Sequence, residues 1–262
     1  MPILQTEYGY IYKKNNKKTV MRTPLKAFLF FVLLVVIMFG CFYAFSVVNI
    51  TTLFGLNQYQ IFEQKQYYAV VVAQGDTYFD VANIDKQIKQ QGGAGYVLNL
   101  DGSCYVIANI YASSDDAQKV CDNLTESFAT SILNIKLSNL VLSAEYTTEQ
   151  ITALKNSLDL VNQSQQKLYE VCISLDKGEI LDAEAKQKLQ IFNETCQYQK
   201  QNLSKVFLDN CDNIVTNVKI FQSELISCLN SIMLSDSLSI DIKYTMASII
   251  NSFLTMQKNI TK

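Results

Sequence analysis

The stretch GSCYVIANIYASSDDAQKVCDNL, residues 102–124, decides the fold of the region around it. Residues 103–112 are rich in β-branched and aromatic side chains and predict a strand. The serines and aspartates at 113–116 are typical of a helix start, and apolar residues follow them at helical spacing. A strand that leads through a short turn into an amphipathic helix is typical of a small mixed α+β domain.

The neighbouring segments extend this unit to a βαββαβ order. A strand and a helix that stops at a Gly-Gly pair precede it, and a hairpin turn signal, Asp101-Gly102, joins its two central strands. The predicted strands cover residues 67–73, 94–100, 103–112 and 131–143, and the first predicted helix covers residues 77–91. This order builds a four-stranded antiparallel sheet with both helices on one face.

The unit resembles a SPOR domain, the small peptidoglycan-binding module of bacterial cell-division and sporulation proteins. The first strand of that family resembles Tyr-x-Val-Gln-Val-Gly-Ala-Phe, and YAVVVAQG, residues 68–75, stands in its place. The third strand of the family carries Tyr-Arg-Val-x-Val-Gly-Pro-Phe, then a polar turn and a helix with an early alanine. Here CYVIANIYASSDDA, residues 104–117, stands at that position, so the resemblance covers residues 67–141.

The resemblance implies a binding surface, because SPOR domains bind glycan on the sheet face that points away from the helices. Strand alternation predicts that this face carries Tyr68, Val70 and Val72, together with Tyr105 and Ile107. The glutamine of the family pattern is replaced by Val70 and the arginine by Tyr105, so the face keeps aromatic groups and loses polar ones. Glycan recognition and protein docking both remain open, with Tyr105 as the expected anchor.

A membrane anchor is predicted before this module. Residues 27–48, AFLFFVLLVVIMFGCFYAFSVV, contain no charged side chain. At about 1.5 Å of rise per residue, a helix of this length crosses a hydrocarbon core of roughly 30 Å, and we expect a single uncleaved transmembrane helix. Residues 1–26 carry six basic side chains and one acidic side chain, so the positive-inside rule predicts a cytoplasmic tail there and extracytoplasmic domains after it. Residues 49–66 are predicted to be a juxtamembrane spacer.

The last part of the chain, residues 147–262, has a different periodicity. Apolar residues recur with alternating spacings of three and four in four segments, and the first segment has one polar interruption, Gln165. Four such segments joined by short turns predict an antiparallel helical bundle or coiled coil. The break at 210–213 contains neither glycine nor proline, so the second and third segments could also form one long helix.

Composition excludes several kinds of chemistry. The chain has no histidine, which removes Ser/His and Cys/His nucleophilic pairs and histidine-based zinc sites. A net charge of -2 gives no general attraction to nucleic acid. The cysteines that follow the apolar run form no CxxC pair, and we expect mostly free, buried thiols, with no bridge between Cys104 and Cys121. We therefore expect no enzyme activity, no metal and no cofactor.

The sequence thus predicts an α+β protein with an N-terminal transmembrane helix, a small βαββαβ module and a C-terminal helical bundle. The first functional hypothesis is a single-pass envelope protein that acts in cell division or sporulation. Its partners would be the lipid bilayer, the glycan strands of peptidoglycan and other envelope or divisome proteins. The alternative is a non-catalytic protein-interaction scaffold whose SPOR-like module has lost glycan binding.

Overall fold

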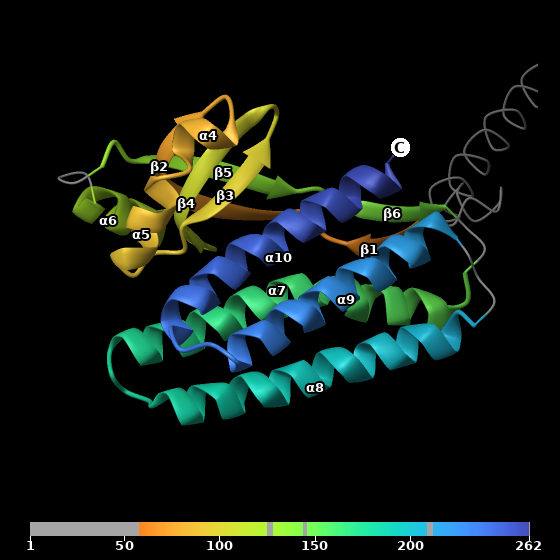
Figure 1. Ribbon diagram of the computed structural model, residues 1–262. Coiled ribbons are helices and arrows are strands. Elements are labelled where there is room, and N and C mark those ends of the chain that lie inside the picture. The colour runs from red at the N-terminus through yellow and green to blue at the C-terminus, as the bar shows by residue number, and fades with distance from the viewer. Residues whose placement is uncertain (1–57, 125–127, 144–145, 209–211, 262) are drawn as a thin grey trace, which may run out of the picture. The chain divides into compact units, whose positions relative to one another are not determined.

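The computed structural model describes residues 58–124, 128–143, 146–208 and 212–261 (Figure 1). The predicted cytoplasmic tail, the predicted transmembrane helix and the first part of the predicted spacer lie outside these residues. Among the helices of the described part, none combines the length and the apolar character needed to cross a membrane.

The predicted four-stranded antiparallel sheet is confirmed. Its strands run in the order β3-β4-β2-β5, and every neighbouring pair is antiparallel. The strands are β2 (Lys65–Gly75), β3 (Tyr96–Leu100), β4 (Ser103–Tyr111) and β5 (Ser131–Leu137). The β3–β4 hairpin turns at Asp101 and Gly102, which adopt φ values of 51° and 86°. These positive values explain the Asp-Gly pair, because side chains larger than those of Gly, Asn and Asp are strained there.

Three helices lie on one face of this sheet: α4 (Tyr78–Val81), α5 (Ile84–Gln90) and α6 (Ser114–Leu124). Apolar residues of these helices form one buried cluster with apolar residues of β2 and β4. The single helix predicted over 77–91 is therefore two short ones. At the start of α4, the Asp80 carboxylate accepts a hydrogen bond from the Thr77 backbone N–H at 2.8 Å, a capping arrangement that fixes where the helix begins.

A second, two-stranded sheet pairs β1 (Gln58–Phe62) with β6 (Leu140–Ser143) in antiparallel fashion. The spacer predicted at 49–66 therefore contains a strand at its end. The strand predicted over 131–143 is interrupted at Ser138, where the Gln257 side chain forms hydrogen bonds with both the backbone N–H and the backbone carbonyl. Gln257 Nε2 donates to Ser138 O at 2.5 Å, and Ser138 N donates to Gln257 Oε1 at 3.1 Å. With these groups occupied, the chain leaves the first sheet and pairs with β1 instead.

The predicted bundle is confirmed as four helices, and the second and third segments are separate helices. The helices are α7 (Thr148–Asp176), α8 (Asp182–Val206), α9 (Asn213–Met233) and α10 (Leu238–Ile260). Consecutive helices pack against each other, and α10 returns to pack against α7 (Figure 1). The backbone N–H of Gln150 donates to the Thr147 hydroxyl at 3.2 Å and caps the start of α7, while Gly178 with φ 69° follows its end.

The last helix, α10, packs on the four-stranded sheet as well as on the other bundle helices. In Figure 1, α10 runs between the four-stranded sheet and the other bundle helices, and it contacts β3, β4 and β5. One continuous apolar core therefore includes residues of the sheet, of β1 and β6, and of all four bundle helices. The described chain from residue 58 onward is accordingly one compact unit, in which the predicted module and the predicted bundle pack together.

Candidate functional site

Three of the five predicted site residues lie on the opposite face of the sheet from the one expected. Val70 and Val72 are buried under α4, α5 and α6, and Tyr68 packs against the same cluster. The expectation failed because alternation shows which residues of one strand share a face, but not how the faces of two strands correspond. The β2–β4 pairing sets Tyr68 opposite Tyr111 and contains two register shifts, which change the phase between the strands.

The other two residues lie on the expected face, but that face is covered. Ile107 belongs to the core beneath α10 and has an exposed fraction of 0%. Tyr105 is half-buried against the same core, and its hydroxyl accepts a hydrogen bond from Gln74 Nε2 at 3.5 Å. A ligand cannot contact Ile107 in this fold, and only the outer part of Tyr105 can be reached from solvent.

Hydrogen bonds hold α10 on this sheet face at three points. Lys243 Nζ donates to the Gly92 carbonyl at 2.8 Å at one end of the helix. Asn251 Nδ2 donates to the Tyr96 hydroxyl at 2.9 Å in the middle, and Gln257 bonds the backbone of residue 138 at the far end. The Tyr244 ring also meets the Tyr96 ring edge-on at 5.0 Å. These polar contacts along the length of α10 fix its position more specifically than apolar packing alone would.

A cavity that sequence reasoning missed lies where the sheet, α6, α7 and α10 meet. It has a volume of about 520 Å³ and is open to solvent on one side. Its lining residues are Lys65, Gln66, Tyr67, Ile110, Tyr111, Ala112, Ser113, Asp116, Asn162, Gln165, Gln166, Tyr169 and Met246. We call this the tyrosine cavity. Its residues come from segments far apart in the sequence, so no local motif announces it.

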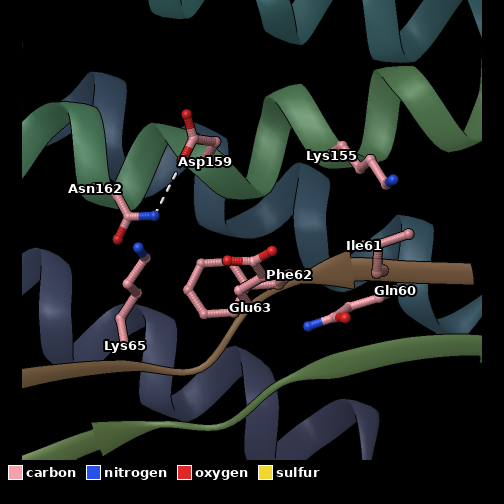
Figure 2. Close-up of a pocket in the computed structure, with 8 residues that line it drawn as sticks. All are labelled: Gln60, Ile61, Phe62, Glu63, Lys65, Lys155, Asp159 and Asn162. Atoms are coloured by element: carbon pink, nitrogen blue, oxygen red, sulfur yellow. Dashed lines mark hydrogen bonds between the residues drawn. The ribbon is translucent and has the colours of Figure 1, made fainter.

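A smaller cavity of about 350 Å³ adjoins the tyrosine cavity and shares Lys65 and Asn162 with it. Figure 2 shows that one wall comes from α7, and that the opposite wall comes from the end of β1 and the chain that leads from it into β2. The Lys65 side chain points toward Asn162 in this view. The other charged residues that line this smaller cavity are Glu63, Lys155 and Asp159. Its lining is therefore more strongly charged than that of the tyrosine cavity.

A chain of hydrogen bonds links residues that line the two cavities. The Tyr67 hydroxyl donates to Asn162 Oδ1 at 2.8 Å, and Asn162 Nδ2 donates to Asp159 Oδ1 at 3.0 Å. Burial, with a smaller contribution from the Asp159 carboxylate, raises the pKa of Tyr67 to about 12. Tyr67 is therefore a neutral donor at physiological pH, and it ties the sheet to α7 rather than acting as a base.

Gln165, the polar interruption of the first seam, lies in the wall of the tyrosine cavity. Its exposed fraction is 5%, and its Nε2 donates to the Met246 carbonyl of α10 at 2.8 Å. Its Oε1 is buried and finds no hydrogen-bond partner within the described residues. A buried acceptor left unpaired costs about 1–3 kcal/mol of folding free energy. This atom therefore either destabilises the fold or accepts a hydrogen bond from a ligand. The sequence signal that marks it is a single glutamine in an otherwise apolar seam.

Two tyrosine rings form the aromatic wall of this cavity. Tyr111 and Tyr169 meet edge-to-face with ring centroids 6.0 Å apart and an angle of 82° between their planes. Asn109 Nδ2 donates to the Tyr111 hydroxyl at 3.0 Å, and burial raises the pKa of Tyr111 to about 12. An edge-to-face pair beside apolar residues is a surface that accepts another ring.

The described residues contain no group of three or more histidine, cysteine, aspartate or glutamate side chains that could hold a metal ion. Burial raises the pKa of Cys172 to about 11 and that of Cys196 to about 12, so both thiols are protonated and poor nucleophiles at neutral pH. Cys104 is a free thiol that donates to Asn99 Oδ1 at 2.8 Å, and it is not bridged to Cys121.

The antiparallel four-stranded sheet with helices on one face agrees with the βαββαβ order predicted from the sequence, but this arrangement occurs in unrelated domains and does not show a family. Comparison with protein-family models, with curated proteins and with solved structures finds no match to this chain.

Proposed function

We propose that this protein is a membrane-anchored, non-catalytic interaction scaffold of the cell envelope, in which a SPOR-like sheet holds a helical bundle instead of a glycan strand. The observation that carries the proposal is the position of α10 on the sheet face that SPOR domains use for glycan. Ile107 is fully buried there, Asn251 bonds Tyr96 in the edge strand β3, and Lys243 bonds Gly92 in the turn that leads into β3. The surface that would stack on sugar rings is thus occupied from within the chain.

The envelope setting is argued from the N-terminal sequence. The uncharged run at 27–48 and the basic residues before it favour a single-pass anchor with a cytoplasmic N-terminus. The unit of sheets and bundle would then lie outside the cytoplasm, among the envelope or divisome proteins that are its proposed partners. A division or sporulation role follows from the SPOR resemblance alone.

Binding of peptidoglycan is the second candidate function, and the half-buried Tyr105 is the observation that favours it. Its ring packs against the core and stays partly exposed, and its hydroxyl accepts a hydrogen bond from the exposed side chain of Gln74. A tyrosine in such a position offers a ring edge and a hydroxyl to a sugar. This candidate requires binding at the rim of the sheet rather than across it.

Sedimentation with purified peptidoglycan sacculi separates the two candidates. Residues 58–262, the compact unit, would be mixed with intact sacculi and with sacculi stripped of stem peptides, and the bound fraction measured after centrifugation. The scaffold proposal predicts no more sedimentation than for a non-binding control protein of similar charge. Sedimentation that Tyr105→Ala abolishes, while the melting temperature stays unchanged, would instead establish glycan binding at the rim.

A further inference from the structure

We infer that the tyrosine cavity receives an aromatic side chain with a single hydrogen-bond donor, a tryptophan or a tyrosine, from a partner protein. This inference rests on the proposed scaffold function and gives it a docking point. It follows from one buried acceptor, two aromatic rings and an apolar floor, all of which line the same cavity.

The acceptor is Gln165 Oε1, and its identity is fixed by its neighbour. The Met246 carbonyl can only accept, so the atom of Gln165 that lies 2.8 Å from it must be the donor, Nε2. Oε1 is then the end of the amide that lacks a partner within the described residues. An N–H or O–H group of a ligand is the chemistry that this atom requires.

The surroundings of the acceptor suit a ring. The side chains of Ile110 and Met246 are almost completely buried and supply apolar surface. Tyr111 and Tyr169 present the edge and the face of their rings to each other, and Tyr169 is only partly buried. The hydroxyls of Tyr67 and Tyr111 are already hydrogen-bonded to Asn162 and Asn109. The carbon atoms of the two rings are therefore the part that a ligand would contact.

Other ligand classes fit less well. A saccharide brings several hydroxyls, each of which needs a partner when it is buried. Among the described residues that line this cavity, Gln165 contributes the one buried side-chain oxygen or nitrogen without a partner. An anion would need a buried cation, whereas the lysine of the lining, Lys65, is exposed. An indole or phenol matches the single acceptor and the apolar floor, and such side chains are frequent anchors at protein interfaces.

Matched small molecules test the inference on residues 58–262. Indole carries one N–H donor, and benzothiophene has nearly the same shape without it. Chemical-shift titrations are expected to show saturable binding of both at the tyrosine cavity, with indole about fivefold tighter, the ratio expected from one net hydrogen bond. N-acetyltryptophanamide, which carries the same ring on a peptide backbone, is expected to bind at the same place because the cavity is open on one side.

Two variants locate the effect. Gln165→Leu is expected to remove the preference for indole and leave benzothiophene binding intact. Gln222→Leu is the matched control, because Gln222 is also a buried glutamine with unpartnered atoms but does not line this cavity, so the preference should remain.

Equal affinity of indole and benzothiophene, or no binding of either to the folded wild-type protein, overturns the inference. Binding of indole without binding of N-acetyltryptophanamide overturns the partner side chain in favour of a free small molecule. The sacculus experiment is independent of these titrations, so failure of one is distinguishable from failure of the other.

Discussion

Phe253→Ala is the substitution that most directly probes the shared core of sheet and bundle. Phe253 lies on α10 with an exposed fraction of 0%. Its ring centroid lies 4.7 Å from that of Phe62 in β1 and 5.2 Å from that of Phe221 in α9. Truncation of a buried phenylalanine to alanine costs about 3–5 kcal/mol, which includes the loss of aromatic contacts. We expect a loss near the upper end of this range, because rings from two other elements lose their partner at once.

Urea unfolding of residues 58–262 measures this loss. Helix content by circular dichroism and tyrosine fluorescence should report one coincident transition, in the wild type and in the variant, because the sheet and the bundle share one core. Phe79→Ala is the matched control, since Phe79 is 90% exposed and its loss should change stability by no more than about 0.5 kcal/mol. A loss of less than about 1 kcal/mol for Phe253→Ala, or two transitions of which only one shifts, would refute the shared core.

Three further predictions concern polar groups. Gln165→Leu should raise the free energy of unfolding by about 1 kcal/mol in urea unfolding, because relief of a buried acceptor without a partner outweighs the loss of the hydrogen bond that Gln165 donates to the Met246 carbonyl; destabilisation would contradict this assignment. Burial raises the pKa of Cys196 to about 12, so the folded state holds this proton more tightly than the unfolded state. The resulting contribution to the free energy of unfolding is fully present below about pH 9 and is lost as the pH rises toward about 12. Cys196→Ala should make the free energy of unfolding fall less steeply between these pH values, and an unchanged slope of free energy against pH would refute the assignment. Tyr96→Phe should cost about 1 kcal/mol by removing the hydrogen bond from Asn251, and a thermal melt unchanged from that of the wild type would show that this contact does not hold α10.

The bundle was predictable from sequence because its seams are long and periodic. Leu154, Leu158 and Val161 follow the alternating spacing of four and three in the first segment, and all three are fully buried. The strands of the module were also predictable, since glycines and an Asp-Gly turn separate short β-rich runs. Local periodicity determines these elements, and the structure differs from prediction mainly where segments distant in sequence meet.

The covering of the sheet by α10 has a signal in the burial pattern of this helix. In α10, neighbouring positions are buried in pairs: Met246 with Ala247, and Ile249 with Ile250. A helix that packs on one layer buries an apolar stripe about 100° wide, and the burial of Ala247 beside Met246 makes the buried face of α10 wider than that. Contact with the bundle alone would leave part of this wide face without a partner.

The faces of β2 and the strand β1 were not predictable in the same way. The phase of β2 against β4 depends on register shifts near Val71, which a single sequence does not reveal. Strand β1 is short, and its partner lies about eighty residues further along the chain, with Gln58 opposite Ser143. The tyrosine cavity depends on the first of these features, because the face on which β2 presents Tyr67 sets part of its wall.

The accessibility of Ile107 tests most directly whether the sheet face is occupied from within the chain. In a cysteine-free background of residues 58–262, Ile107→Cys would be labelled with a maleimide, with Asn134→Cys, an exposed position of β5, as the reference. Occupation by α10 predicts that Cys at 107 reacts only as fast as the protein unfolds, and many times more slowly than Cys at 134. Labelling at the two positions at equal rates in the folded protein would contradict the account, because the sheet face would then be open to a glycan strand.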